Sequence, residues 1–378
     1  MPSSISNSSH RAPDLNYRNA ILAALAVALS AAAALAAANA YFDPFNFGAP
    51  GPKAPFDRVN QFRLKNTALW EIASVERVLK ALPEASDAQY LIIGDSRARA
   101  MTGSWRKDST LFVQDHRGRK IFNLAYGGAD LTTSLMIYER YKARFPKAET
   151  VIFAVQFDEL SDTERRTDQM EEALRIAKNP LFYYVSFRTL KVALDGMKDR
   201  EKFAPRQDAS AKLRMTKLTA PKKYRRTMRY PATNDLQKLF DDARTIRLTK
   251  LARTTILNSD PSVVARNIDS IIRLVVERDP GRKFLFVAMP MHPVLERRVA
   301  GEKAAGYAAM ASGLRGLGFF YDASMYDGAA TAFKFIDAMH VKDAAPDIMQ
   351  DAIDCSLHPT DHTSVIAHDG HSPCPGGD

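Results

Sequence analysis

Residue types that together carry out acyl transfer stand in two short motifs far apart in the chain. The first motif, Gly94-Asp95-Ser96, follows the apolar run at residues 90–93 and leads into a helical pattern. A serine hydroxyl becomes an effective nucleophile near neutral pH only when a base removes its proton. Aspartate and serine are also preferred N-cap residues, so this motif alone fits a simple helix start equally well.

The second motif, Asp337-Ala338-Met339-His340, lies after the last apolar run of the chain. An aspartate three residues before a histidine can place both side chains on one side of a turn. A hydrolytic triad needs a base within hydrogen-bond reach of the nucleophile and an acid that fixes the tautomer of that base. The two motifs together predict Ser96 as nucleophile and His340 as general base, with Asp337 as the acid that orients His340.

Apolar runs that alternate with helical patterns must position these motifs. The predicted strands are 90–96, 121–126, 150–157, 283–290 and a weaker run at 319–324, and the main helical patterns are 131–145, 263–279 and 294–318. Strands that are apolar on both faces and separated by helices are typical of a parallel sheet. The sequence therefore predicts the α/β class, with a three-layer, doubly wound parallel sheet. Ser96 would stand at the carboxyl edge of that sheet, where functional groups collect.

An uncharged segment near the N-terminus predicts export. Residues 19–40 carry no charge, and about 20 apolar residues are needed to cross a bilayer as a helix. Arg11 and Arg18 precede this segment, so residues 1–18 are expected to stay in the cytoplasm. We expect a single-pass anchor in a bacterial inner membrane, with the catalytic domain in the periplasm.

Two alternatives to a retained anchor remain open. Ala38-Asn39-Ala40 also fits a signal-peptidase site, and cleavage there would release a secreted protein. A buried, alanine-rich helix of a soluble protein is the other reading, because alanine is only weakly apolar.

The remaining segments differ in composition. Residues 41–57 are rich in proline, glycine and aromatic residues, which predicts a linker, and residues 58–350 form the predicted catalytic domain. Strand patterns stop between about residues 160 and 260, which indicates a helical insertion. Its stretch 209–234 carries eight lysines and arginines and no acidic residue. Such a run is either a solvated face or a site for an anionic polymer or the membrane surface.

Residues 351–378 form a predicted tail with both cysteines of the chain, Cys355 and Cys374. One pair of cysteines in an exported chain favours a disulfide. The histidines of the tail share no metal-site spacing, so no metal is predicted. The formal charge of +10 favours an anionic partner, and without a nucleic-acid-binding signature this partner is expected to be a glycan or the membrane, not a nucleic acid.

The motifs resemble those of the SGNH (GDSL-type) esterase and acyltransferase superfamily. Its first block is Gly-Asp-Ser after the first strand, its last block is Asp-x-x-His, and its second block is similar to the segment that ends in Gly127-Gly128. The resemblance implies a flavodoxin-like domain, an acyl-serine mechanism without a cofactor, and oxyanion donors at the backbone N–H groups of Ser96 and Gly128. Gly127 is the alternative donor, and both glycines also fit a plain turn.

The third block of the family, Gly-x-Asn-Asp, falls on residues 155–158 and lacks the asparagine that donates to the oxyanion. Gln156 is the candidate replacement, since it shares a strand face with Asp158. Asp158, His292 and Arg97 are candidate substrate contacts. A structural role for His292 and a surface ion pair for Arg97 are the competing interpretations.

Among SGNH proteins, the anchor, the Asp-Pro-Phe-Asn-Phe segment and the insertion are most similar to membrane-tethered proteins of exopolysaccharide O-acylation. These include the alginate O-acetylation proteins and the D-alanine transfer protein of teichoic acid synthesis. The resemblance implies transfer of an acyl group from Ser96 to a polysaccharide hydroxyl beside a multi-spanning membrane acyltransferase. A plain carbohydrate or lipid esterase and a non-catalytic polysaccharide-binding scaffold are the alternatives.

Overall fold

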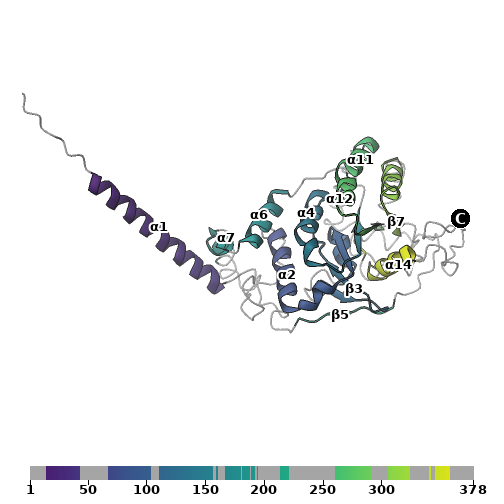
Figure 1. Ribbon diagram of the computed structural model, residues 1–378, viewed down its shortest axis with the longest axis horizontal. Helices are drawn as coiled ribbons and strands as arrows, with labels where there is room; N and C mark the ends of the chain where they lie inside the picture. The colour runs from purple at the N-terminus through teal and green to yellow at the C-terminus, as the bar shows by residue number, and fades with distance from the viewer. Residues whose placement is uncertain are drawn as a thin grey trace, which may run out of the picture.

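A seven-stranded sheet forms the centre of the protein in the computed structural model (Figure 1). The structure describes residues 14–42, 67–103, 110–155, 159–160, 167–179, 181–187, 189–191, 194, 213–220, 260–290, 305–323, 340–341 and 345–357. The strands are β1 Tyr90–Gly94, β2 Phe112–Gln114, β3 Lys120–Asn123, β4 Thr150–Ala154, β5 Thr216–Lys217, β6 Lys283–Ala288 and β7 Phe319–Asp322. All five predicted strands are therefore confirmed, each shorter than the apolar run that predicted it.

Five of the strands run parallel, in the order β3-β1-β4-β6-β7. Counted along the chain, this order is 2-1-3-4-5. The connections move to one side of β1 and then cross to the other, so β1 and β4 flank a topological switch point. In open α/β sheets of this kind, ligands bind beside the carboxyl ends of the strands at that point.

Two short strands that the sequence did not predict extend the sheet beyond β3. β2 pairs antiparallel with β3, and β5 pairs parallel with β2. β5 lies inside the predicted insertion, which is thus joined to the sheet edge. The insertion also contributes helix α6 to the main core through Met170, Ala173 and Ile176. The insertion is helical as predicted, and in addition it supplies a two-residue edge strand and buries one face of a helix in the main core.

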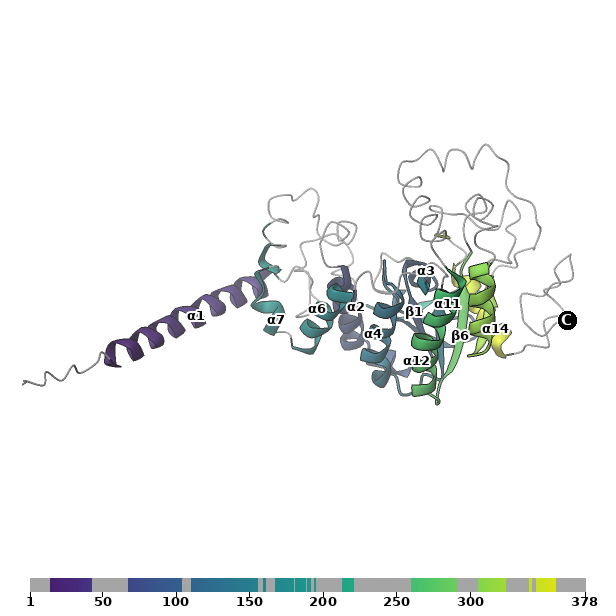
Figure 2. The same ribbon diagram turned by 90° about the horizontal axis from the view of Figure 1, so that it is seen from above.

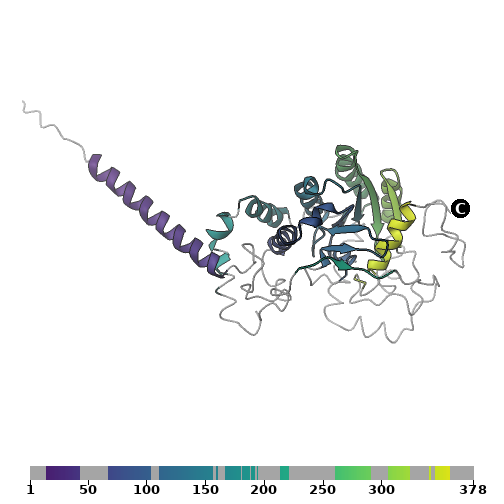
Figure 3. The same cartoon turned by 60° about the horizontal axis from the view of Figure 1, so that its bottom comes forward.

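Helices cover both faces of the sheet because alternate strand residues point to opposite sides. Leu91 and Ile93 pack in one core, and Ile92 packs in the other. The first face carries α2 Thr67–Ala81, α4 Leu131–Tyr141, α6 Thr167–Lys178, α11 Pro261–Asn267, the π-helical η5 Ile268–Ile272, α12 Arg273–Arg278 and the helical residues 305–315 (Figure 3). The second face carries α3 Ser96–Ala100 and α14 Ala345–Leu357. The predicted α/β layering is confirmed.

Helix α1, Asp14–Phe42, extends away from the sheet domain (Figure 1). Its segment Tyr17–Tyr41 is long and apolar enough to cross a membrane. The helix continues without a break through residues 38–42, where the sequence predicted the start of a linker. A short helix of the insertion, α7 Leu181–Tyr184, packs against the same end of α1.

The C-terminal helix α14 runs to Leu357, so the predicted tail begins later than residue 351. Cys355 lies on this helix, is buried, and is disulfide-bonded. Cys374, the other cysteine of the chain, lies outside the described residues. Within the basic stretch 209–234, the described Arg214 and Lys217 are exposed.

Candidate active site

Gly94 ends β1 and lets the chain turn sharply at the carboxyl edge of the sheet. Its φ is +133°, a region that side chains of L-residues rarely adopt. A Cβ at this position would lie 2.7 Å from the carbonyl oxygen of Ala154 and 2.9 Å from the Cβ of Ala98. A glycine is therefore required for β1 and α3 to pack this closely against β4.

Asp95 and Ser96 are both residue types that cap helices, and in the structure Asp95 is the cap. Asp95 is the N-cap of α3, and its carboxylate accepts a hydrogen bond of 2.8 Å from the backbone N–H of Arg97. Ser96 is the first helical residue and is partly exposed, while all other residues of 90–102 are buried. The cap interpretation thus applies to Asp95, and Ser96 is presented at the surface of the sheet edge.

The structure brings the two distant motifs together. Ser96 Oγ lies 2.6 Å from His340 Nε2, although 244 positions separate the residues in the chain. Helix α14, which follows the His340 segment, packs against α3 on the same face of the sheet. A neutral imidazole with its proton on Nδ1 would accept the Ser96 hydroxyl proton at Nε2. Asp337, the predicted orienting acid, lies outside the described residues.

Arg97 is buried next to Ser96 rather than exposed at the surface. Its guanidinium is 2.9 Å from Asp95 Oδ2 and 3.2 Å from Glu159 Oε1, and its side chain is 3% exposed. The buried position of Arg97 therefore does not support the predicted contact with a glycan. Arg97 does form an ion pair, as the alternative expected, but the pair is buried and not at the surface. Because Glu159 follows β4, Arg97 connects the loops after β1 and β4 at the switch point.

The electrostatic effect of this cluster is clearest on Asp95. Burial alone would raise the pKa of Asp95, but the charge and hydrogen bonds of Arg97, with a smaller contribution from His340, outweigh burial and hold the pKa below its usual value. Asp95 therefore stays ionised, as its ion pair with Arg97 requires.

Asn123, at the end of β3, holds α3 from the other side. Its buried Nδ2 donates hydrogen bonds of 3.0 Å to the carbonyl of Ala98 and 2.9 Å to Thr102 Oγ1. Its Oδ1 accepts from the backbone N–H of Ala125 at 2.9 Å. One side chain thus connects the start of the β3–α4 loop to the helix that carries Ser96.

The segment after β3 runs alongside the nucleophile turn. The backbone N–H of Tyr126 donates to the carbonyl of Gly94, the last residue of β1, at 3.2 Å, which continues the pairing with β1 past the end of β3. Gly127 and Gly128 follow directly and are partly exposed, and Gly128 has a φ of +83°. The structure therefore places the two candidate oxyanion glycines at the same edge as Ser96.

The other candidates are less well placed or not described. Gln156, Asp158 and His292 lie outside the described residues, so their predicted roles stay predictions. Arg99, which follows Ser96 on α3 and was not a predicted site residue, is buried, and its Nη1 donates to Thr110 Oγ1 at 3.3 Å.

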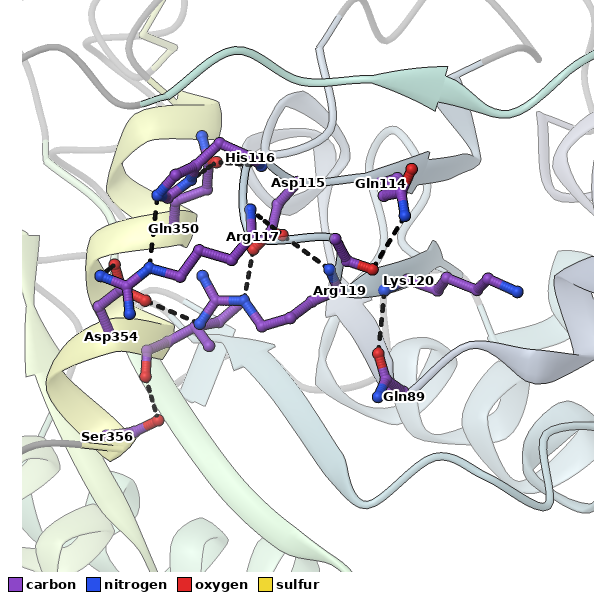
Figure 4. A network of polar contacts seen from close by, with 12 residues as sticks. Gln89, Gln114, Asp115, His116, Arg117, Arg119, Lys120, Gln350, Asp354 and Ser356 are labelled. Atoms are coloured by element: carbon purple, nitrogen blue, oxygen red, sulfur yellow. Dashed lines mark hydrogen bonds and ion pairs between the residues drawn. The ribbon is translucent and has the colours of Figure 1, made fainter.

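Helix α14 is held to the β2–β3 hairpin by a polar network that Figure 4 shows from close by. Arg119 Nη1 lies 2.7 Å from Asp354 Oδ1, and Arg117 Nη2 lies 2.9 Å from Asp354 Oδ2. His116 Nδ1 is 2.7 Å from Gln350 Oε1. Because His340 precedes α14, this network helps to fix the position of the candidate base.

Sequence analysis did not identify the residues that support the site. Asn123 precedes the two candidate glycines and ends an apolar strand. A polar residue at that place in the sequence could have indicated a role at the carboxyl edge of the sheet. The roles of Glu159 and Gln350 could not be predicted, because their partners, Arg97 and His116, are 62 and 234 positions away in the chain.

Comparisons with protein-family models, curated proteins and solved structures find no match for this chain. A partly exposed serine within hydrogen-bond reach of a histidine, at the switch point of a parallel sheet, can carry out nucleophilic attack on a carbonyl carbon.

Proposed function

We propose that this protein is a membrane-anchored serine acyltransferase or esterase of the SGNH type, which acts on O-acyl groups of a cell-envelope or exported polysaccharide. The distance of 2.6 Å between Ser96 Oγ and His340 Nε2 carries the proposal. Two motifs that were chosen from the sequence for their chemistry meet at hydrogen-bond distance, which neither motif alone required. The strand order and the glycines after β3 agree with the same family resemblance.

In the first half of the reaction, Ser96 Oγ attacks the carbonyl carbon of the acyl donor while His340 Nε2 takes the hydroxyl proton. The backbone N–H groups of Ser96 and Gly128 stabilise the oxyanion of the tetrahedral intermediate, with Gln156 as a further donor. The C–O bond to the leaving group then breaks, and His340 returns its proton to the departing oxygen. The product of this half-reaction is an acyl ester of Ser96.

In the second half, a sugar hydroxyl attacks the acyl-serine, and His340 takes its proton. Collapse of the second tetrahedral intermediate forms the sugar ester and returns the proton to Ser96 Oγ. Water in place of the sugar hydroxyl gives hydrolysis by the same steps. Transferase and esterase therefore differ only in the acceptor.

Helix α1 and the disulfide support the proposed location of the protein. A helix that is able to span a membrane precedes the domain, and the disulfide bond of Cys355 favours an oxidising compartment. We infer a single-pass protein of a bacterial inner membrane with its domain in the periplasm, beside a multi-spanning protein that supplies the acyl group.

Ester turnover by the full-length protein in lipid nanodiscs tests the chemistry. Wild type is compared with Ser96→Ala and His340→Ala on p-nitrophenyl acetate, and Ser86→Ala, in the 3-10 helix Pro83–Asp87 before the start of β1 and thus at the opposite edge of the sheet, is the matched control. We expect both site variants to lose activity by on the order of 10³-fold or more, and the control to retain it. A fluorophosphonate probe should label Ser96, as identified by peptide mass.

Products are then analysed with an oligosaccharide acceptor present. Acylated sugar identifies a transferase, and free acid alone identifies an esterase. Equal background turnover in all four proteins, together with no labelling of Ser96, would contradict the serine mechanism.

A further inference from the structure

Exposed apolar side chains gather at one end of the molecule. Among the described residues, thirteen large apolar side chains are exposed, and seven of them lie on α1. Four more lie within residues 181–194, and two lie elsewhere, Leu274 and Leu357. We call the four the apolar patch; it consists of Leu181, Phe182, Phe187 and Leu194, with exposures of 60%, 43%, 78% and 41%. A patch of this kind on a soluble surface marks a contact with a partner or a membrane.

The apolar patch is held beside the domain end of α1. Asn39, near that end, is fully buried, and its Nδ2 donates hydrogen bonds of 2.6 Å to the carbonyl of Tyr184 and 3.0 Å to that of Ser186. Figures 1 and 2 show α7 next to the end of α1 in both views. The start of the patch therefore has a fixed position relative to the helix that could cross the membrane.

The length of α1 places this contact at the level of the lipid headgroups. The apolar segment Tyr17–Tyr41 has 25 residues. About 20 helical residues cross the hydrocarbon core of roughly 30 Å, so the ends of this segment reach the interfacial region. Asn39 lies two residues before the end of the segment. Its buried amide, and the α7 backbone that it binds, are therefore expected at the membrane surface.

Basic side chains accompany the apolar patch. Arg175 and Lys178 in the last turn of α6 and Lys191 after α7 are all exposed. The guanidinium of Arg175 lies over the ring of Phe182, 5.0 Å from its centroid. Apolar and aromatic side chains flanked by lysine and arginine are typical of segments that lie in the interface of a membrane with anionic lipids.

We propose that the apolar patch, Leu181, Phe182, Phe187 and Leu194, forms a second membrane contact and inserts into the interface of the bilayer that α1 crosses. Arg175, Lys178 and Lys191 bind anionic headgroups around it. A single helix fixes only the distance of a domain from the membrane. The second contact, held to α1 by Asn39, also fixes which side of the domain faces the lipid, and this does not depend on the chemistry of Ser96.

Spin-label depth measurements on the full-length protein test this contact. The protein has no free cysteine among its described residues, so a nitroxide can be attached to Phe187→Cys or, as a second site, Leu181→Cys. Leu274→Cys, another exposed apolar position, on the remote helix α12, is the matched control. The samples are nanodiscs of phosphatidylethanolamine and phosphatidylglycerol, without any other membrane protein.

We expect labels at 187 and 181 to collide more with oxygen than with a water-soluble nickel chelate, and the label at 274 to show the reverse. Asn39→Ala should raise the nickel collision rate at 187 several-fold, because α7 loses its two hydrogen bonds to α1. Nickel access at both patch sites equal to that at 274 would overturn the proposal and leave the apolar patch as a docking surface for a protein. An unchanged rate in Asn39→Ala would overturn the positioning role of Asn39.

Discussion

Two clusters of buried charge hold the two halves of the candidate site, and they differ in how their charges are supported. Under Ser96, Arg97 lies between Asp95 and Glu159, and these three side chains are 3–12% exposed. On α14, the helix that follows His340, Asp354 contacts both Arg119 and Arg117, and Arg117 is 48% exposed. The two carboxylates near Ser96 therefore share one arginine, Arg97, which is almost fully buried. Asp354, on the helix after His340, has a second arginine that is half exposed to solvent.

This difference predicts that substitutions in the cluster around Arg97 lower the unfolding free energy more than substitutions in the cluster around Asp354. Removing one partner of a buried ion pair leaves a charge in a medium that solvates it poorly, which costs more than the pair itself contributes. A second arginine at the same carboxylate reduces that cost.

Arg97→Met should be the most damaging change. It keeps the apolar stem of the side chain but leaves Asp95 and Glu159 buried without their common arginine, and we expect a loss of about 3–5 kcal/mol in unfolding free energy. Denaturant unfolding and p-nitrophenyl acetate turnover both measure the effect, since the Ser96 turn loses its connection to the loop after β4. A loss below about 1 kcal/mol would show that Arg97 is not a principal support.

Arg119→Met should cost less, about 1–3 kcal/mol. Asp115 loses its arginine but keeps hydrogen bonds from the backbone N–H groups of residues 117 and 119, and Asp354 keeps Arg117. Burial lowers the pKa of Arg119, and the hydrogen bonds and charges of Asp115 and Asp354 outweigh burial and raise it. Unfolding free energy and ester turnover are compared with those of Arg97→Met. An equal or greater loss of stability would refute the proposed asymmetry between the clusters.

Asp95→Asn isolates the acid dependence of the cluster around Arg97. The pKa of Asp95 in the folded protein lies below its usual value of 3.8, so its stabilisation is complete above pH 3.8 and is lost as the pH falls through the lower folded value. Asparagine still caps α3 but has no such titration. Unfolding free energy measured below pH 3.8 should fall less steeply in the variant, and parallel curves would contradict the assignment.

Arg117→Ala should have the smallest effect, between about 0 and 1 kcal/mol, because solvent screens an ion pair of a half-exposed arginine. Chemical denaturation in the same buffer gives the comparison with Arg119→Met. A loss as large as that of Arg119→Met would mean that the exposed arginine carries the contact with α14.

The main elements of this fold were predictable because β1, β3, β4, β6 and β7 are buried on both faces, which leaves continuous apolar runs. β2 and β5 were not predicted, since strands of three and two residues carry too little pattern. The π-helical turn Ile268–Ile272 left no mark on the helical periodicity at residues 263–279.

The pair Ser96 and His340 was predictable from residue types whose chemistry is rare in combination. The residues that hold Ser96 and His340 in place were not predictable. In the sequence, nothing distinguishes Arg97 from an arginine at the protein surface. The contact of Arg97 with Glu159 depends on the neighbouring positions of β1 and β4 in the sheet, which no local pattern encodes. The same holds for Asn39, which the sequence presented as part of a cleavage site and the structure places against α7.

Gly94, Asp95 and Ser96 each serve one separable purpose, which matters for redesign of the turn. Position 94 must lack a side chain for the backbone to fit, and position 95 must carry a short hydrogen-bonding group that caps the helix. Position 96 alone presents a reactive atom. Position 96 can therefore be changed on an unchanged backbone: a cysteine there would present a thiol in place of the hydroxyl, and an alanine would present no reactive atom.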